Sequence, residues 1–428
     1  MTRPAQASWV AAVRAGTGRA VSALSQWLRR PLTSLHLVLG VFGLLTLFGL
    51  VMVLSASTVA SFDATHGGTP YSVFGKQLLF CVPGLLLFYV GLRVPPARLR
   101  AMAPTLLLIC VVLLAAVLVV GVDLNGSRAW FRIGTISVQP SEVAKVALIL
   151  WGAHVLAARR AVIHRWRYAL SPVVPVFGVV LLLLVLEPDL GLAVTIGVVL
   201  MALLFYAGAP PKLLAGLCAG AAGGALVLAL SAPYRLARVT AFLNPGVDPA
   251  ADYQSKQALY SLAGGGLFGS GLGQGSAKWN YLPNAHNDFI FAIIGQELGF
   301  LGAFAVLALF ATLAYAGLRI ARRTRDPWLS MVVAVVTTSL VVQAAINISY
   351  VVGLLPVTGL TLPLISSGGT SLVVTMFEFG VLAGAARHEP EAVAALRNHG
   401  QGRVAKALRL PLPEAYKAPA RRPATGVR

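Results

Sequence analysis

The stretch LHLVLGVFGLLTLFGLVMVL, residues 35–54, decides the class of fold. It holds no Lys, Arg, Asp or Glu, and nearly all of its side chains are aliphatic or aromatic. A helix of about 20 apolar residues is long enough to cross the hydrocarbon core of a bilayer. The stretch therefore predicts a transmembrane helix.

Further apolar segments of this kind follow along the chain. Of its 428 residues, 57% are hydrophobic and 11% are charged, whereas a soluble domain carries roughly 25% charged residues. We therefore predict an all-α polytopic membrane protein with ten transmembrane helices in one membrane domain, residues 35–388. The expected spans are about 35–60, 73–92, 104–122, 140–157, 170–187, 190–207, 212–231, 287–318, 329–352 and 369–388.

The distribution of Lys and Arg predicts the orientation of these spans. With the N-terminus in the cytoplasm, the cytoplasmic segments hold 26 Lys and Arg, and the outer loops hold six. This bias follows the positive-inside rule, so we expect both termini in the cytoplasm. The rule also explains the net charge of +20 without nucleic-acid binding. Residues 1–34 are then a basic cytoplasmic arm, and residues 389–428 a basic tail that we expect to be disordered.

Two outer loops are long, at residues 123–139 and 232–286. The second lies between the seventh and eighth spans, and we expect a short helix near 254–263 in it, followed by a glycine-rich stretch at 264–275. The six Lys and Arg of the outer loops could meet an anionic substrate such as a lipid diphosphate. They could equally serve loop solubility, and their charge alone leaves both explanations open.

Acidic residues in or beside the spans are costly and usually functional. With this orientation they all fall in the outer half of the membrane, and the cytoplasmic half holds almost no polar chemistry. This distribution indicates a cavity that opens outward rather than a polar path across the membrane. The acids are Glu142, Glu187, Asp189, Asp288, Glu297 and Glu378.

Two acidic motifs each allow two interpretations. Glu142 and Lys145 are three residues apart on one helix face, so they could neutralise each other inside the bundle, or Lys145 could bind phosphate. Glu187 and Asp189 flank Pro188 between two short spans. They could bind a cation or cap a helix, and we favour a structural role.

Two small-residue motifs resemble anion sites only in part. The glycine-rich stretch has no Gly-Lys-Ser/Thr after it, so we interpret it as a turn and not as a nucleotide loop. The sequence SSGGT at 366–370 precedes the last span. The N–H groups there could bind an anion, or the serines could cap the helix.

Asp288 follows PNAHN at 283–287 and begins the eighth span. A carboxylate at a helix N-terminus is stabilised by the helix dipole, which fits a capping role. Partial burial would favour the neutral acid, and a balance of the two effects suits a general base. Glu297 is nine residues further on, about 180° around an ideal helix. We therefore expect Glu297 to be an interhelical hydrogen-bond partner and not a second carboxylate at the same site.

Five motifs together resemble the SEDS family of peptidoglycan glycosyltransferases, which includes FtsW and RodA. The resemblance covers about residues 35–388. The sequence AHNDFIFA at 285–292 is closer to the FtsW branch, and to its actinobacterial members, than to the RodA branch. The motifs are GSRAW at 126–130, QPSEVAK at 139–145, EPDLG at 187–191, KWNYLPNAHNDFIFA at 278–292 and LPLISSGGTS at 362–371.

The resemblance implies an inverting glycosyltransferase that polymerises lipid II into β-1,4-linked glycan strands during cell division. It places the reaction at the outer face of the bacterial plasma membrane, at the division septum. Asp288 would be the general base, and undecaprenyl diphosphate the leaving group. Lys278 is the first candidate to offset the diphosphate charge, followed by Lys145, Arg128 and Arg238. The same motifs assign substrate binding to Trp130, Glu142 and His286.

The resemblance also implies partners and leaves alternatives. We expect a class B penicillin-binding protein of the FtsI type and other division proteins as partners, and no nucleic acid. A divalent cation, Mg²⁺ or Mn²⁺, could assist, although no metal-ligand cluster is legible in the sequence and the three cysteines lie in apolar runs. The alternatives are a lipid II flippase, a RodA-type elongation polymerase, or a scaffold that only docks division proteins.

Overall fold

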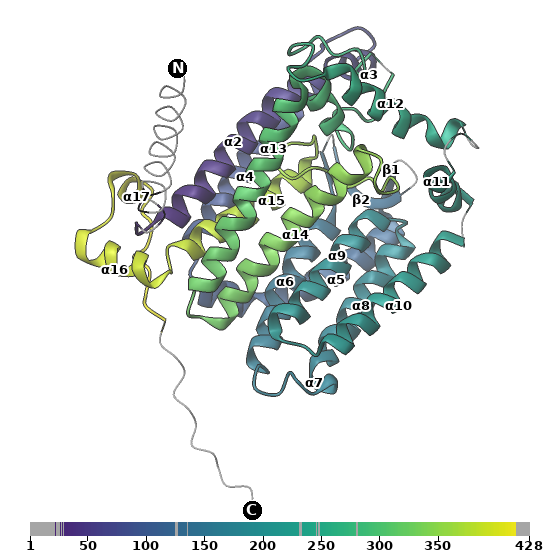
Figure 1. Ribbon diagram of the computed structural model, residues 1–428. Coiled ribbons are helices and arrows are strands. Elements are labelled where there is room, and N and C mark those ends of the chain that lie inside the picture. The colour runs from purple at the N-terminus through teal and green to yellow at the C-terminus, as the bar shows by residue number, and fades with distance from the viewer. Residues whose placement is uncertain are drawn as a thin grey trace, which may run out of the picture.

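The computed structural model describes residues 30–416, except 125, 126, 135, 231, 232, 245, 247, 248 and 280, together with Ser22, Gln26 and Leu28. Most of the expected arm 1–34 and residues 417–428 lie outside the described residues. The described chain is a bundle of long helices with a small sheet toward one end and short helices at both ends (Figure 1).

Within the described ranges, nine helices are long and apolar enough to cross a membrane. A polytopic helical membrane protein is therefore confirmed. The expected span 170–187 is the shorter apolar helix α8 (Val173–Leu186). The nine are α2 (Thr33–Ala56), α4 (Ser72–Arg93), α5 (Pro96–Val120), α6 (Pro140–Ala158), α9 (Leu190–Ala207), α10 (Pro211–Leu230), α13 (Ile290–Arg323), α14 (Pro327–Val351) and α15 (Gly369–Ala386).

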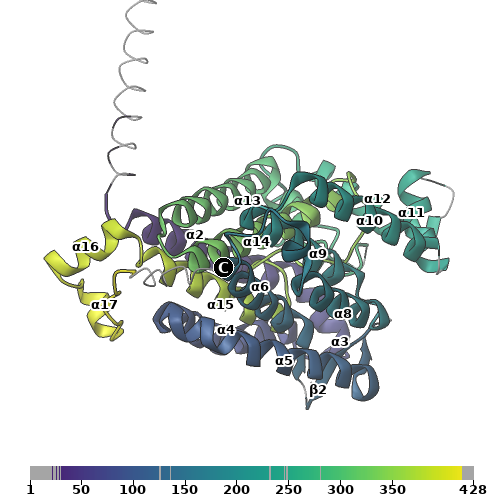
Figure 2. The same cartoon turned by 90° about the horizontal axis from the view of Figure 1, so that it is seen from below.

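The centre of the bundle is formed by α6, α14 and α15, which are the most buried of the nine helices together with α9. Small residues bring α15 and α4 close together: a Cβ on Gly380 would lie 2.2 Å from the carbonyl oxygen of Phe88. Close backbone approach at small residues is a common way for helices to pack in membranes. In contrast, the most apolar part of α10 has no buried residues, and Figure 2 shows α10 and α11 at the edge of the bundle.

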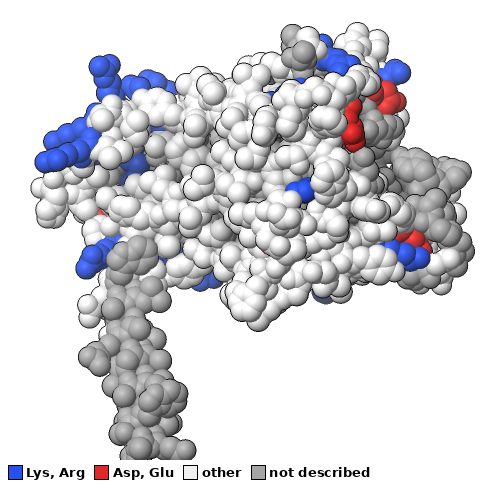
Figure 3. Space-filling model, turned by 90° about the horizontal axis from the view of Figure 1, so that it is seen from above, with Lys and Arg blue, Asp and Glu red and all other residues white. Residues whose placement is uncertain are grey.

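The surface charges are distributed along the helix direction. Figure 3 shows Lys and Arg at one end of the visible face, both signs of charge at the opposite end, and few charges between. An apolar belt between two charged ends is what a membrane-spanning bundle requires.

The loop expected at 123–139 contains most of a three-stranded antiparallel sheet that begins at Val122, which the all-α prediction did not include. Its strands are β1 (Val122–Leu124), β2 (Ser127–Ile133) and β3 (Ile136–Val138), in the order β1-β2-β3. In register, Val122 pairs with Trp130, and Phe131 pairs with Val138. The sequence Asn125-Gly126 between β1 and β2 is a strong hairpin signal that would have predicted the first turn.

The segment between α10 and α13 contains two helices, α11 (Pro233–Leu243) and α12 (Pro249–Gly265). The second is longer than the helix expected near 254–263. Short helices also follow α2 and α6, at α3 (Thr58–Ala64) and α7 (Trp166–Leu170).

The C-terminal segment differs from the expected disorder. Residues 390–407 contain α16 (Pro390–His399) and α17 (Arg403–Ala407), and Leu396 and Leu410 are buried. The hydroxyl of Tyr89 donates to the carbonyl of Leu408 at 2.8 Å. The basic composition of residues 390–407 therefore did not prevent them from forming helices. The apolar residues of α16 recur at helical spacing and are buried.

Candidate functional site

Asp288 lies in the turn that leads into α13, next to the segment that joins α14 and α15. The helix begins at Ile290 with Phe289 at the N-cap, so Asp288 does not occupy the cap position that the sequence suggested. Its side chain is half-buried, and its Oδ2 lies 3.7 Å from where a Cβ on Gly359 would be. Gly359 has a φ of 76°. A glycine there leaves room beside the carboxylate and tolerates the left-handed backbone.

The two serines of the sequence SSGGT hold the backbone that precedes Asp288. The backbone N–H of Ser367 donates to the carbonyl of His286 at 2.9 Å. The hydroxyl of Ser366 donates to the carbonyl of Asn287 at 2.8 Å. The N-cap of α15 is Gly368, without a side-chain cap. The serines therefore bind the turn before α13, and neither caps α15.

Two buried side chains of α14 bind the next carbonyl. The hydroxyl of Tyr350 donates to the carbonyl of Asp288 at 2.8 Å, and Nδ2 of Asn347 donates to the same oxygen at 2.9 Å. Sequence reasoning missed both residues. The available signal was the spacing of Asn347 and Tyr350, which are three residues apart and so share a face of a span that is largely apolar.

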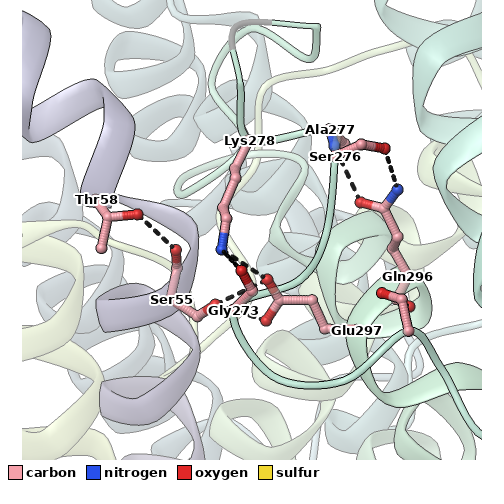
Figure 4. A network of polar contacts seen from close by, with 9 residues as sticks. Ser55, Thr58, Gly273, Ser276, Ala277, Lys278, Gln296 and Glu297 are labelled. Carbon is pink, nitrogen blue, oxygen red and sulfur yellow. Dashed lines mark hydrogen bonds and ion pairs between the residues drawn. The ribbon is translucent and has the colours of Figure 1, made fainter.

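Lys278 forms a buried ion pair in a network that joins three parts of the chain (Figure 4). Its Nζ lies 3.3 Å from Oε1 of Glu297 and also donates to the carbonyl of Gly273. The hydroxyl of Ser55 in α2 donates to the Glu297 carboxylate at 2.6 Å. Glu297 is therefore an interhelical hydrogen-bond partner, as predicted. Lys278 was the first candidate to bind the diphosphate, but its ammonium group is paired with the carboxylate of Glu297.

The glycine-rich stretch compensates for a break in α13. Gly299 has non-helical angles, with φ 68° and ψ −165°, and this removes helical hydrogen bonds around it. Inside a membrane, backbone groups freed in this way must find other partners. The glycine-rich stretch supplies them. The bonds are Ser270 N–H to Gln296 O, Gly271 N–H to Glu297 O, Phe300 N–H to Gly266 O and Leu301 N–H to Leu267 O.

Side chains reinforce the same contact. Oε1 of Gln296 accepts from the N–H of Ala277 at 3.1 Å, and its Nε2 donates to the hydroxyl of Ser276 at 3.0 Å (Figure 4). A Cβ on Gly269 would lie 2.2 Å from the carbonyl of Glu297. The stretch is thus a turn, as the sequence interpretation expected. Its packing against α13 was not predicted, and its glycines permit this close approach.

Lys145 is completely buried between two acids. Its Nζ lies 3.1 Å from Oε2 of Glu142 and 3.9 Å from Oε1 of Glu378 on α15. Of the two interpretations of this motif, the geometry favours neutralisation inside the bundle. Glu142 and Lys145, both predicted to bind substrate, form an ion pair with each other.

Glu187 and Asp189 lie at the junction of α8 and α9. Asp189 caps α9, because its carboxylate accepts from the N–H of Leu192 at 3.0 Å, and it also accepts from Nε2 of Gln139 at 2.7 Å. Glu187 is buried, and neither of its carboxylate oxygens has a hydrogen-bond partner in the described structure. Burial, and then the charge of Asp189, raise the pKa of Glu187 to about 8. Burial raises the pKa of Asp189 to about 6.

Strand β2 brings Arg128, Trp130 and Arg132 to one face. Alternate residues of a strand point the same way, and both arginines are exposed. Arg132 was missing from the predicted substrate ligands, because the period of two became visible only with the strand. Arg238 lies in α11, and its side chain is outside the described residues.

His286 precedes Asp288 by two residues and is partly buried. Burial lowers its pKa, which favours the neutral imidazole at neutral pH. Metal ligands are sparse: within the described part of the chain, no three His, Cys, Asp or Glu residues form a group that could hold a metal ion. Cys81 and Cys110 are buried, whereas Cys218 on α10 is exposed.

Comparisons with known proteins agree with this architecture. The family of cell cycle proteins FtsW, RodA and SpoVE matches residues 35–391. A probable peptidoglycan glycosyltransferase FtsW of Mycobacterium tuberculosis is 51% identical over 94% of this chain and 77% of its own. The stage V sporulation protein E of Bacillus subtilis is 38% identical over 83% of this chain and 98% of its own.

Two solved structures have the same fold. A chain of a peptidoglycan synthase complex aligns with a TM-score of 0.67 and 28% identity, over 85% of this chain and 99% of its own. RodA of Thermus thermophilus aligns with a TM-score of 0.61 and 29% identity over the same shares. The match over almost the whole membrane bundle shows that the chain belongs to the FtsW/RodA/SpoVE family.

Proposed function

We propose that this protein polymerises lipid II into β-1,4-linked glycan strands at the outer face of the plasma membrane during cell division. The names of its relatives support the reaction, since the mycobacterial protein is called a probable peptidoglycan glycosyltransferase. Most Lys and Arg lie in the segments at the opposite ends of the helices from Asp288, and the positive-inside rule assigns those segments to the cytoplasm. This bias supports a reaction at the outer face of the membrane. The division role is supported by the 51% identity to FtsW, against 29% to a RodA structure.

The proposed step uses Asp288 as general base. Its carboxylate takes the proton of the 4-hydroxyl of the acceptor sugar as that oxygen forms a bond to the anomeric carbon of the donor. The bond from this carbon to the diphosphate breaks, and undecaprenyl diphosphate leaves with the electron pair. Attack opposite the leaving group inverts the anomeric carbon. A diphosphate leaves as a stable anion, so one carboxylate suffices where glycosidases use two.

One observation carries the assignment to Asp288. Its carboxylate is half-buried beside Gly359, just before the start of α13, where a sugar hydroxyl could reach it. Glu142, Glu297 and Glu378 are instead enclosed within the bundle, each within 4 Å of a buried lysine. A general base must come within hydrogen-bond reach of its proton, and the enclosed acids are shielded from a substrate.

The exposed arginines of β2 are the proposed partners of the diphosphate. Lys278 and Lys145 are engaged with glutamates, whereas Arg128 and Arg132 project from one face of the strand with Trp130 between them. Guanidinium groups bind phosphate through paired hydrogen bonds. We therefore assign the main compensation of the diphosphate charge to Arg128 and Arg132 of β2 instead of Lys278.

A class B penicillin-binding protein is the proposed partner. Support comes from the structural similarity to a chain of a peptidoglycan synthase complex. The exposed surfaces of α10 and of other outer helices leave room for a single partner helix to pack in the membrane.

The test uses the purified full-length chain in lipid nanodiscs with lipid II and its cognate penicillin-binding protein. Asp288→Ala and Asp288→Asn should abolish glycan polymer on gels while lipid II still binds. Asp63→Asn, at an exposed position in α3, is the matched control and should polymerise normally. Full polymerisation by Asp288→Asn would overturn the proposal. Transfer of lipid II between leaflets of vesicles without any polymer would instead support the flippase alternative.

A further inference from the structure

We infer that Tyr350 and Asn347 of α14 are positioning residues that hold Asp288 in its reactive place by clamping the peptide carbonyl of Asp288. This inference rests on the proposed role of Asp288 as general base. It starts from the turn before α13, in which the carbonyls of residues 286, 287 and 288 are all bound by groups from outside the turn.

The clamp ties two segments to one point of α14. Nδ2 of Asn347 donates to the carbonyl of Asp288 at 2.9 Å and to the carbonyl of Leu360 at 2.6 Å. The hydroxyl of Tyr350 lies 2.8 Å and 2.7 Å from the same two oxygens. The amide nitrogen of Asn347 carries two N–H groups, one for each carbonyl, whereas the single hydroxyl hydrogen of Tyr350 goes to one of the two carbonyls at a time. The turn that carries Asp288 and the segment that carries Gly359 are therefore fixed relative to each other.

The donors belong to one polar face of an apolar helix. Gln343, Asn347 and Tyr350 are four and three residues apart, so they share one face of α14, and all three are buried. Gln343 continues the pattern, because its Nε2 donates to the carbonyl of Thr361 at 3.0 Å. Buried polar groups in a membrane helix are costly unless they are hydrogen-bonded. The two amide nitrogens are bonded, whereas the amide oxygens of Gln343 and Asn347 have no partner in the described structure. Because these side chains lie on one face of α14 and bind the carbonyls of residues 360 and 361, that face fixes the position of this backbone segment.

The support acts on the carboxylate through the backbone. The Asp288 side chain has only two rotatable bonds, so the position of its carbonyl and Cα largely decides where the carboxylate can reach. Tyr350 also packs edge-on against Phe289, with ring centroids 5.7 Å apart and an interplanar angle of 72°. One tyrosine thus holds both Asp288 and the residue that follows it in the chain.

The experiment compares kcat and KM of glycan polymerisation for Tyr350→Phe and Asn347→Leu in the full-length chain with its penicillin-binding partner. We expect kcat to fall about 10- to 100-fold, because a displacement of about 1 Å can cost a factor of about 100. KM, lipid II binding and the thermal unfolding temperature should stay near wild type. Tyr206→Phe is the matched control, since its hydroxyl contacts Thr338 on the outer surface of α14, and it should keep full activity.

Each outcome decides the inference. Wild-type kcat in Tyr350→Phe, with an inactive Asp288→Asn, would overturn the clamp but leave the proposed function intact. Wild-type activity in Asp288→Asn would overturn both. A parallel loss of lipid II binding, thermal stability and kcat would show a merely structural role and overturn the inference. If Asn347→Leu does not fold, Tyr350→Phe decides alone, because it removes only one oxygen and keeps the packed ring.

Discussion

The ammonium of Lys278 lies 3.3 Å from the carboxylate of Glu297, and both side chains are buried. The pair connects the segment between α12 and α13 to the first half of α13, two residues before the break at Gly299. Ser55 extends the connection to α2. A loop lysine that the sequence assigned to the outer face therefore has a partner within the protein, and its charge need not indicate an anionic substrate.

Removal of one member of this pair should destabilise the protein strongly. Breaking a buried ion pair costs about 3–5 kcal/mol, because the remaining charge is buried alone. We expect Lys278→Met to lower the thermal unfolding temperature clearly, and Lys278→Met combined with Glu297→Gln to recover part of the loss. Thermal unfolding of the purified chains in detergent measures both. If the loss in the double variant equals the sum of the losses in Lys278→Met and Glu297→Gln alone, the pair contributes no coupling.

The glycines at the break of α13 should not tolerate a side chain. A Cβ on Gly269, which has a φ of 83°, would lie 2.2 Å from the Glu297 carbonyl, and a Cβ on Gly299 would lie 2.4 Å from the Gly269 nitrogen. We expect Gly269→Ala and Gly299→Ala to reduce the yield of folded protein severely.

Gly197 in α9 provides the matched control for these substitutions. Nothing lies within 4 Å of a Cβ at this position, and alanine is favoured over glycine in a helix by about 1 kcal/mol. Gly197→Ala should therefore be neutral or slightly stabilising. Size-exclusion profiles of the extracted variants compare them. A well-folded Gly299→Ala would mean that α13 can run straight without the glycine-rich stretch.

Stability should fall as pH rises through the range in which Glu187 ionises. The pKa of Glu187 is about 8 in the folded protein, against an ordinary value of 4.5. The folded state therefore holds the proton more tightly, so the stabilisation is complete below about pH 4.5 and is lost as the pH rises toward about 8. Glu187→Gln keeps the shape and cannot ionise.

Thermal unfolding of wild type and Glu187→Gln from about pH 5 to about pH 9 checks this sign. The variant should gain on wild type progressively with rising pH and level off above about pH 8. A constant difference across the range would contradict a raised pKa for Glu187.

The arginines of β2 should act on substrate affinity. We expect Arg128→Ala and Arg132→Ala each to raise KM about three- to tenfold with little change in kcat, the result of losing one exposed charge-assisted contact. The effect should shrink at high salt, since exposed charges are screened. Arg98→Ala, at an exposed position near the start of α5, is the control. An unchanged KM in both β2 variants would show that these arginines do not bind the diphosphate, and other cationic residues would have to do so.

The sequence by itself determined the membrane class, the positions of the spans and the residue at the centre of the proposed site. A span is a local property, because about 20 apolar residues suffice to define it, and the count of Lys and Arg predicts an orientation. The motif around Asp288 was equally legible, as was the separation of Glu297 from it. These features depend on residues close together in the chain.

Only the tertiary structure decided which polar groups meet. Ser55 and Glu297 are 242 residues apart, and Tyr350 reaches the carbonyl of Asp288 across 62. Whether Lys278 faces a substrate or Glu297 depends on how the glycine-rich stretch packs against a broken helix. The physical reason is that buried hydrogen bonds and ion pairs are set by short distances between segments, whereas hydrophobic length and charge bias are properties of each segment alone.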